Sequence, residues 1–82
     1  MRYKQYVGVV ARFSPEGDLR PLEILWPDGT RYEITRVLDV KPRASLRVGG
    51  VGMRYTCVIH AKETYLFLEE NRWFVEAKAE YT

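Results

Sequence analysis

The chain has 82 residues, of which 46% are hydrophobic and 13% aromatic, and it carries a formal net charge of +2 at pH 7. This length supports a single domain, residues 1–82, and this composition excludes a disordered or fibrous chain. No apolar run approaches the ~18 residues of a membrane-spanning helix or forms a signal peptide, so we expect a cytoplasmic protein. The single cysteine, Cys57, cannot form an internal disulfide, which agrees with a reducing compartment.

Short runs rich in Val, Ile, Tyr, Phe and Trp alternate with turn sequences that contain Pro and Gly. This pattern predicts six strands, at residues 5–13, 19–26, 30–40, 51–59, 63–69 and 72–78. The fold class that follows is all-β, a small antiparallel barrel or roll of five to six strands, similar in size to SH3-like and OB-like domains. A helix is expected at most as one short turn within residues 42–48.

Local signals refine this prediction in the first half of the chain. Pro27-Asp28-Gly29 is typical of a three-residue hairpin loop, because glycine can take the positive φ that ends such a loop. The alternation of buried and exposed positions is broken at Val37, Leu38 and Val40, which predicts a bulge or a barrel corner.

The second half predicts a three-stranded meander with two-residue turns at Ala61-Lys62 and Glu70-Asn71. These turns place Cys57 opposite Leu66, and Leu68 opposite Trp73, on one apolar face. The reverse face would carry three aromatic residues, Tyr65, Phe67 and Phe74. Either the first strand folds over these rings and closes a barrel, or the rings form an exposed platform for a partner.

No catalytic or cofactor-binding motif is present. Cys57 and His60 are three residues apart, so on one strand their side chains point to opposite faces and cannot act as a nucleophile and its base, unless the strand ends between them. A lone histidine does not make a metal site, which usually needs three or four ligands. We therefore expect no enzymatic activity, no cofactor and no bound metal.

The positive charge is concentrated in the middle of the chain. Residues 31–54 hold six basic and two acidic residues, whereas the remainder is slightly acidic. The segment 41–50 is the longest connection and contains three basic residues and no acidic one, and long connections often carry function. The candidate contacts to an anionic partner such as nucleic acid are Arg36, Lys41, Arg43, Arg47 and Arg54.

The sequence Trp26-Pro27-Asp28-Gly29-Thr30-Arg31-Tyr32-Glu33-Ile34-Thr35-Arg36-Val37-Leu38-Asp39, followed by Arg54-Tyr55, Tyr65-Leu66 and Arg72-Trp73-Phe74, resembles a family of small uncharacterised bacterial proteins that form a domain of unknown function. The resemblance covers roughly residues 21–76. It implies a similar fold, and it favours nucleic-acid contact because related domains occur near bacterial DNA-repair genes. It transfers no catalytic residue.

These observations lead to three hypotheses about function. The first is a cytosolic binding or interaction module without catalytic activity, whose partner is a protein or a nucleic acid and not a membrane. The second is a homo-oligomeric structural or accessory domain that associates through strand edges or through the aromatic face. The third is weak nucleic-acid binding through the basic segment 41–50, and a small enzyme ranks last.

Overall fold

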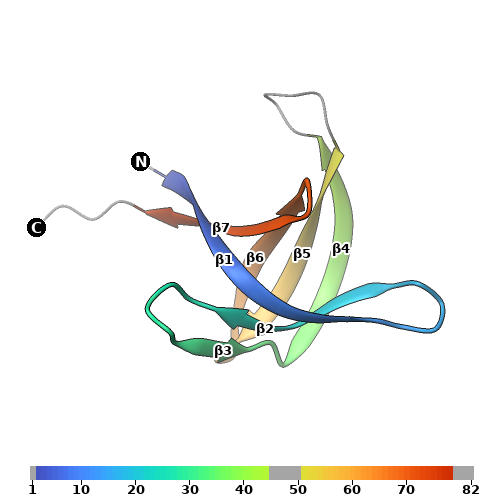
Figure 1. The fold of residues 1–82 in the computed structure, drawn as a ribbon, viewed down its shortest axis with the longest axis horizontal. Helices are drawn as coiled ribbons and strands as arrows, with labels where there is room; N and C mark the ends of the chain where they lie inside the picture. Colours follow the sequence, from blue (N-terminus) through green and yellow to red (C-terminus); the bar gives the residue numbers. More distant parts are fainter. Residues whose placement is uncertain (1, 45–50, 79–82) are drawn as a thin grey trace, which may run out of the picture.

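The computed structural model describes residues 2–44 and 51–78, and within them the chain forms a single antiparallel sheet (Figure 1). Its strands are β1 (Arg2–Phe13), β2 (Leu19–Leu25), β3 (Arg31–Glu33), β4 (Arg36–Ala44), β5 (Val51–Ile59), β6 (Lys62–Glu69) and β7 (Arg72–Lys78). Their order in the sheet is β3-β2-β1-β7-β6-β5-β4. The predicted all-β antiparallel roll is confirmed, with seven strands where five to six were expected.

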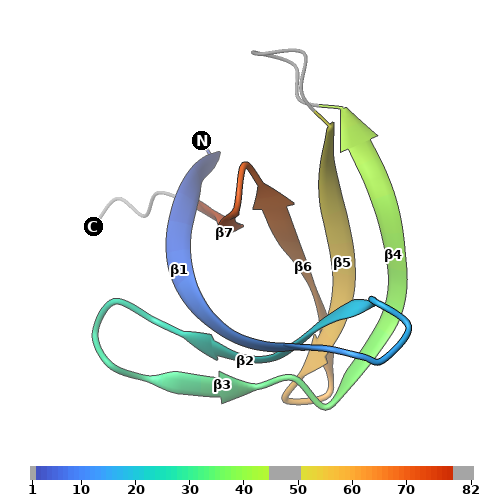
Figure 2. The same cartoon turned by 45° about the vertical axis from the view of Figure 1, so that its right-hand side comes forward.

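The sheet curls into half a barrel because β1 belongs to both of its parts. Residues 2–7 of β1 pair with β7, whereas residues 8–13 pair with β2. A Cβ added to Gly8 would lie 3.3 Å from Cβ of Leu25, so the missing side chain permits a close approach where the partner strand changes. Figure 2 shows β2 passing across the lower parts of β5 and β6, with β3 below β2 at the left.

The predicted strand at 30–40 is wrong in one respect, because it is divided at Ile34 and Thr35 into β3 and β4. The backbone N–H of Ile34 donates to the carbonyl of Leu22 at 2.9 Å, and that of Thr35 donates to the carbonyl of Val58 at 2.9 Å. Leu22 lies in β2 and Val58 in β5, so this connection links the two ends of the curled sheet.

The loop and bulge predictions are confirmed. Gly29 has a φ of 92°, and the Trp26 N–H donates to the Thr30 carbonyl at 2.8 Å, which leaves Pro27-Asp28-Gly29 as a three-residue loop. In β4 the pairing with β5 shifts between Val37 and Asp39, so Leu38 is the bulged residue. A bulge of this kind re-aims the side chains that follow it.

The expectation of a helical turn within 42–48 is wrong for residues 42–44, which extend β4. Pro42 and Arg43 pair with Met53 and Gly52 of β5. Residues 45–48 lie outside the described residues.

The predicted register between β5 and β6 is shifted by two residues. The turn falls at His60-Ala61, where φ is 49° and 62°, so Cys57 pairs with Thr64 instead of Leu66. Positive φ at both central positions is the signature of the tight turns that suit the twist of a hairpin. Because the shift is an even number of residues, every side chain stays on its predicted face.

The pairing of Leu68 with Trp73 across the Glu70-Asn71 turn is confirmed.

The hydrophobic core fills the concave side of the sheet. Its buried members come from five different segments and are Ile24, Ile34, Tyr55, Cys57, Leu66 and Val75. The predicted core position of Cys57 is confirmed, since its side chain is 0% exposed. Within residues 2–44 and 51–78, no helix is long and apolar enough to cross a membrane.

Candidate functional site

A continuous row of side chains crosses the convex, outer face of the sheet. Lys41 pairs with Arg54, Arg54 with Phe67, Phe67 with Phe74, and Phe74 with Tyr6, so the row runs over β4, β5, β6, β7 and β1. Residues directly opposite each other on neighbouring strands point to the same side of a sheet. The row therefore places cationic and aromatic side chains side by side on one surface.

The aromatic members of this surface touch one another. The rings of Phe67 and Phe74 are stacked, with centroids 5.0 Å apart and an interplanar angle of 12°. Tyr6 meets Phe74 edge-on at 5.7 Å, and Tyr65 lies 6.4 Å from Phe67. The contacts make a chain of four rings from three strands.

Basic side chains cover the two central rings. The guanidinium of Arg43 lies 4.6 Å from the centroid of Phe67, and the ammonium of Lys4 lies 4.7 Å from that of Phe74. These distances are typical of cation–π contacts. Phe67 is 2% exposed and Phe74 is 3% exposed, although both lie outside the core.

The two outer rings are covered less. Arg54 lies 4.6 Å above Tyr65, and Arg72 lies 3.6 Å above Tyr6. Tyr65 remains 50% exposed and Tyr6 39% exposed, so both rings offer a face or an edge to a partner. The basic–aromatic face, as we define it, consists of Lys4, Tyr6, Lys41, Arg43, Arg54, Tyr65, Phe67, Arg72 and Phe74.

The expectation that the first strand folds over Tyr65, Phe67 and Phe74 is wrong. Strand β1 lies beside β7 in the same sheet and adds Tyr6 to the aromatic face. Phe67 and Phe74 are covered by long basic side chains because the aliphatic stems of Lys and Arg can shield apolar surface while their charges stay in water.

Three of the five predicted basic contacts come together on this face. Lys41, Arg43 and Arg54 line a groove of about 410 Å³ together with Tyr65 and Phe67. Arg36 lies at the opposite end of β4 from Arg43, where it pairs with Val58. Arg47 lies outside the described residues.

Three of the basic side chains on this face form ion pairs with carboxylates. They are exposed pairs between a basic residue of the face and a neighbouring carboxylate: Lys4 with Glu69 at 3.2 Å, Lys41 with Asp39 at 3.6 Å, and Arg43 with Glu76 at 3.9 Å. Exposed pairs of this kind are worth roughly 0–1 kcal/mol each, so a polyanion can compete with them.

Arg54 has unused hydrogen-bonding capacity. Its Nε–H is buried and finds no acceptor among the described residues. A guanidinium has five N–H donors in a planar fork, which suits phosphate and carboxylate oxygens. Arg54 lies between Lys41 and Phe67 in the row and lines the groove with Lys41 and Arg43, where such an acceptor would meet several cations at once.

The cysteine is no part of this site. Cys57 lies inside the half-barrel, and burial raises the pKa of its thiol to about 11. A thiol with so high a pKa is almost entirely protonated at neutral pH, and the thiolate is the nucleophilic form.

Sequence reasoning missed Lys4, Tyr6 and Arg72. Lys4 and Tyr6 are two residues apart on β1, and Arg72 and Phe74 are two residues apart on β7, so each pair lies on one face of its strand. The spacing was visible in the sequence. The pairing of the first strand with the last was not, because nothing local specifies it.

No protein-family model, curated protein or solved structure matches this chain. The resemblance to the small bacterial family therefore stays a prediction.

Proposed function

We propose that the chain is a binding module without catalytic activity, whose basic–aromatic face binds an anionic polymer, with single-stranded nucleic acid as the first candidate. The observation that carries this proposal is the continuous row of cationic and aromatic side chains across β1, β4, β5, β6 and β7, in which four rings each contact a basic side chain. Proteins that bind single strands combine positive charge for the backbone with aromatic rings for the bases.

The exposed and the buried members of the face would have different roles in binding. Tyr65 and Tyr6 are the exposed rings and would stack on bases. Arg54, Arg43 and Lys41 line the groove beside Tyr65 and would bind phosphates. Phe67 and Phe74 are buried beneath cations and would support the platform without contacting bases.

The test is a titration of labelled oligo(dT), of a mixed single strand and of the corresponding duplex, followed by fluorescence anisotropy at several salt concentrations. We expect the single strands to bind more tightly than the duplex, because only unstacked bases can reach a ring. Binding must weaken with salt, since phosphate neutralisation releases counterions.

The informative variant is Arg43→Gln with Arg54→Gln. It should flatten the slope of log K against log salt by about 1.4, because each neutralised phosphate of a single strand contributes about 0.7 to that slope. Arg20→Gln with Arg31→Gln is the matched control, because Arg20 lies on β2 and Arg31 on β3, away from this face. Tyr65→Ala should cost about 1–3 kcal/mol of binding if the ring stacks on a base.

Absence of binding near 100 μM protein at low salt, beyond the usual non-specific range of roughly 1–100 μM, would remove nucleic acid as the partner. Equal effects of the two double variants would show that net charge alone drives binding.

Self-association is a second candidate, because the sheet ends in open edges at β3 and β4. The β4 edge carries a bulge at Leu38 followed by Lys41, Pro42 and Arg43. Bulges, Lys and Pro are the devices that prevent strands from adding to an edge. A molecular mass measured by light scattering over a range of concentrations tests this candidate in the same samples.

A further inference from the structure

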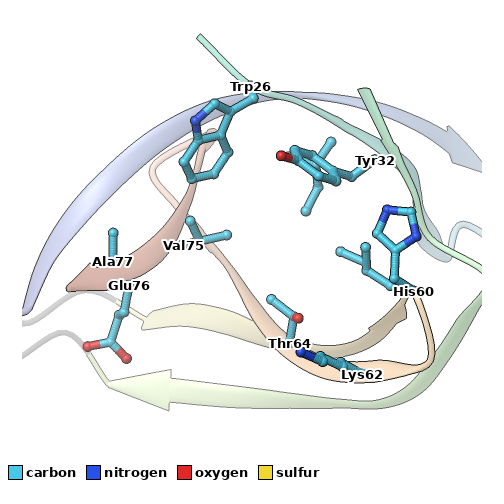
Figure 3. Close-up of a pocket in the computed structure, with 10 residues that line it drawn as sticks. Trp26, Tyr32, His60, Lys62, Thr64, Val75, Glu76 and Ala77 are labelled. Atoms are coloured by element: carbon cyan, nitrogen blue, oxygen red, sulfur yellow. The ribbon is translucent and has the colours of Figure 1, made fainter. Parts of the chain in front are cut away.

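A second candidate site lies on the concave side, where the sheet splits between β6 and β7. The ladder between these strands contains Phe67–Phe74, Leu68–Trp73 and Glu69–Arg72, and ends there. Both strands continue beyond it, β6 back to Lys62 and β7 on to Lys78. A cavity of about 460 Å³ opens at this split (Figure 3).

The walls of the cavity are mainly apolar and aromatic. Ile24, Ile59 and Val75 form its aliphatic part. Trp26 meets Tyr32 at 6.2 Å with an interplanar angle of 85°, so the two rings form adjacent, perpendicular walls. A volume of this size and an apolar lining are typical of sites for small molecules.

Polar side chains line part of the cavity. His60, Lys62 and Thr64 come from the β5–β6 turn and from the start of β6, and Figure 3 shows Lys62 and Thr64 together across the cavity from Trp26. Lys62 forms no ion pair with any residue in the described ranges.

The acidic residue at the rim does not neutralise Lys62. The carboxylate of Glu76 lies 3.9 Å from the guanidinium of Arg43, on the outer face of the sheet. The cavity thus combines an apolar end with a cationic, hydrogen-bond-donating end.

We propose that this cavity binds a small carboxylate with an aromatic or branched aliphatic body. The body packs against Trp26, Tyr32 and Val75, and the carboxylate is bound by Lys62, with the Thr64 hydroxyl and His60 beside it. An ammonium donor and a carboxylate form a charge-assisted hydrogen bond, which is stronger than a bond between neutral groups. Lys62 and His60 are exposed to solvent, whereas Ile24 and Val75 on the apolar side of the cavity are buried.

Three probes with the same body separate the contributions of charge and shape: 3-phenylpropanoate, 3-phenylpropanamide and 3-phenylpropan-1-amine. Each is titrated into the ¹⁵N-labelled protein, with the backbone amides of Thr64 and Ala77 and the indole N–H of Trp26 as reporters. We expect the carboxylate to shift these resonances and to bind about tenfold more tightly than the amide, the difference expected for one charge-assisted hydrogen bond.

The variant Lys62→Met keeps the aliphatic stem and removes the charge, so it should abolish the preference for the carboxylate over the amide. Arg20→Met makes the same change in net charge on β2, outside the lining of the cavity, and should preserve the preference. Unchanged spectra away from the cavity show that each variant is folded.

Equal or tighter binding of the amide or the amine would overturn the proposal, because the cavity would then select for shape or for a cation. So would the lack of any shift at about 10 mM probe, since even weak fragments bind in the millimolar range. Lys62→Met should leave oligonucleotide binding unchanged, so failure of this site and failure of the basic–aromatic face are separable.

Discussion

The two faces of the half-barrel bury neighbouring residues of one strand by different means. Leu66 and Phe67 are adjacent on β6 and are 0% and 2% exposed. Leu66 belongs to the hydrophobic core on the concave side. Phe67 lies between the ring of Phe74 and the guanidinium of Arg43. Equal burial therefore does not mean an equal environment, because Leu66 lies among apolar core residues whereas Phe67 is covered by an aromatic ring and a guanidinium.

From this comparison we expect the largest difference in the free energy of unfolding between substitutions at Leu66 and at Phe67. Leu66→Ala should lower the free energy of unfolding by about 2–5 kcal/mol, because it leaves a cavity in a close-packed core. Phe67→Leu keeps an apolar side chain and mainly loses a ring stack worth about 0.5–1.5 kcal/mol. Urea unfolding of both variants measures the difference. A loss for Phe67→Leu as large as that for Leu66→Ala would show that the outer face is a second core.

Because Cys57 is buried on the inner face, the free energy of unfolding should decrease at alkaline pH. Burial raises the pKa of this thiol from 9.0 to about 11, so the folded state favours the neutral form. The contribution is fully present below pH 9 and is lost as the pH rises through about 11, at most roughly 3 kcal/mol for a shift of this size.

The measurement is the free energy of unfolding from pH 7 to 11 for the natural chain and for Cys57→Ala. The variant should show a shallower decline, whatever its stability at pH 7. Some decline should remain, because burial also raises the pKa of Tyr55. Identical slopes for the two proteins would show that the thiol ionises freely and is not enclosed.

The sequence was sufficient to predict the faces of the residues in β5, β6 and β7, but not all pairings. In β2 the expected alternation fails, because Leu22, which was grouped with Ile24, is 38% exposed next to a register shift in the β1–β2 pairing. Alternation put Cys57, Leu66 and Leu68 inside and Tyr65, Phe67 and Phe74 outside, and those assignments are correct for the described strands. The turn was placed one residue too late, because His60-Ala61 lacks the glycine that marks such turns. The error moved each partner by two positions and changed no face.

The candidate site was predicted less well than the fold because it is assembled by long-range pairing. Arg43 and Arg54 were singled out from local charge. Lys4 and Tyr6 reach the same face only because β1 pairs with β7, and local sequence patterns do not determine which strands pair. The cavity has the same origin, since it depends on where the β6–β7 ladder ends.

The turn at His60-Ala61, which fixes the pairing of β5 with β6, gives a prediction of a smaller effect that stabilises the protein. Ala61 has a φ of 62°, a left-handed conformation that costs a residue with a Cβ about 1–2 kcal/mol. Ala61→Gly should therefore raise the free energy of unfolding by up to about 1 kcal/mol, after the greater chain entropy of glycine is subtracted. Asn71→Gly, at a φ of 64° in the next turn, should gain less because asparagine tolerates this region. Destabilisation by Ala61→Gly in thermal unfolding would contradict this account of the turn.

The smallest effect tests whether cations stabilise the outer face through the rings or through carboxylates. Arg43 contacts the ring of Phe67 at 4.6 Å and the carboxylate of Glu76 at 3.9 Å. Arg43→Gln should cost about 0.5–1 kcal/mol, the value of a cation–π contact at an exposed site. Glu76→Gln removes only the exposed ion pair and should cost less, because such pairs contribute little. Urea unfolding at low and high salt compares the two variants. If Glu76→Gln costs as much as Arg43→Gln, and both losses vanish at high salt, ion pairing is what stabilises this face, and the rings are buried by shape alone.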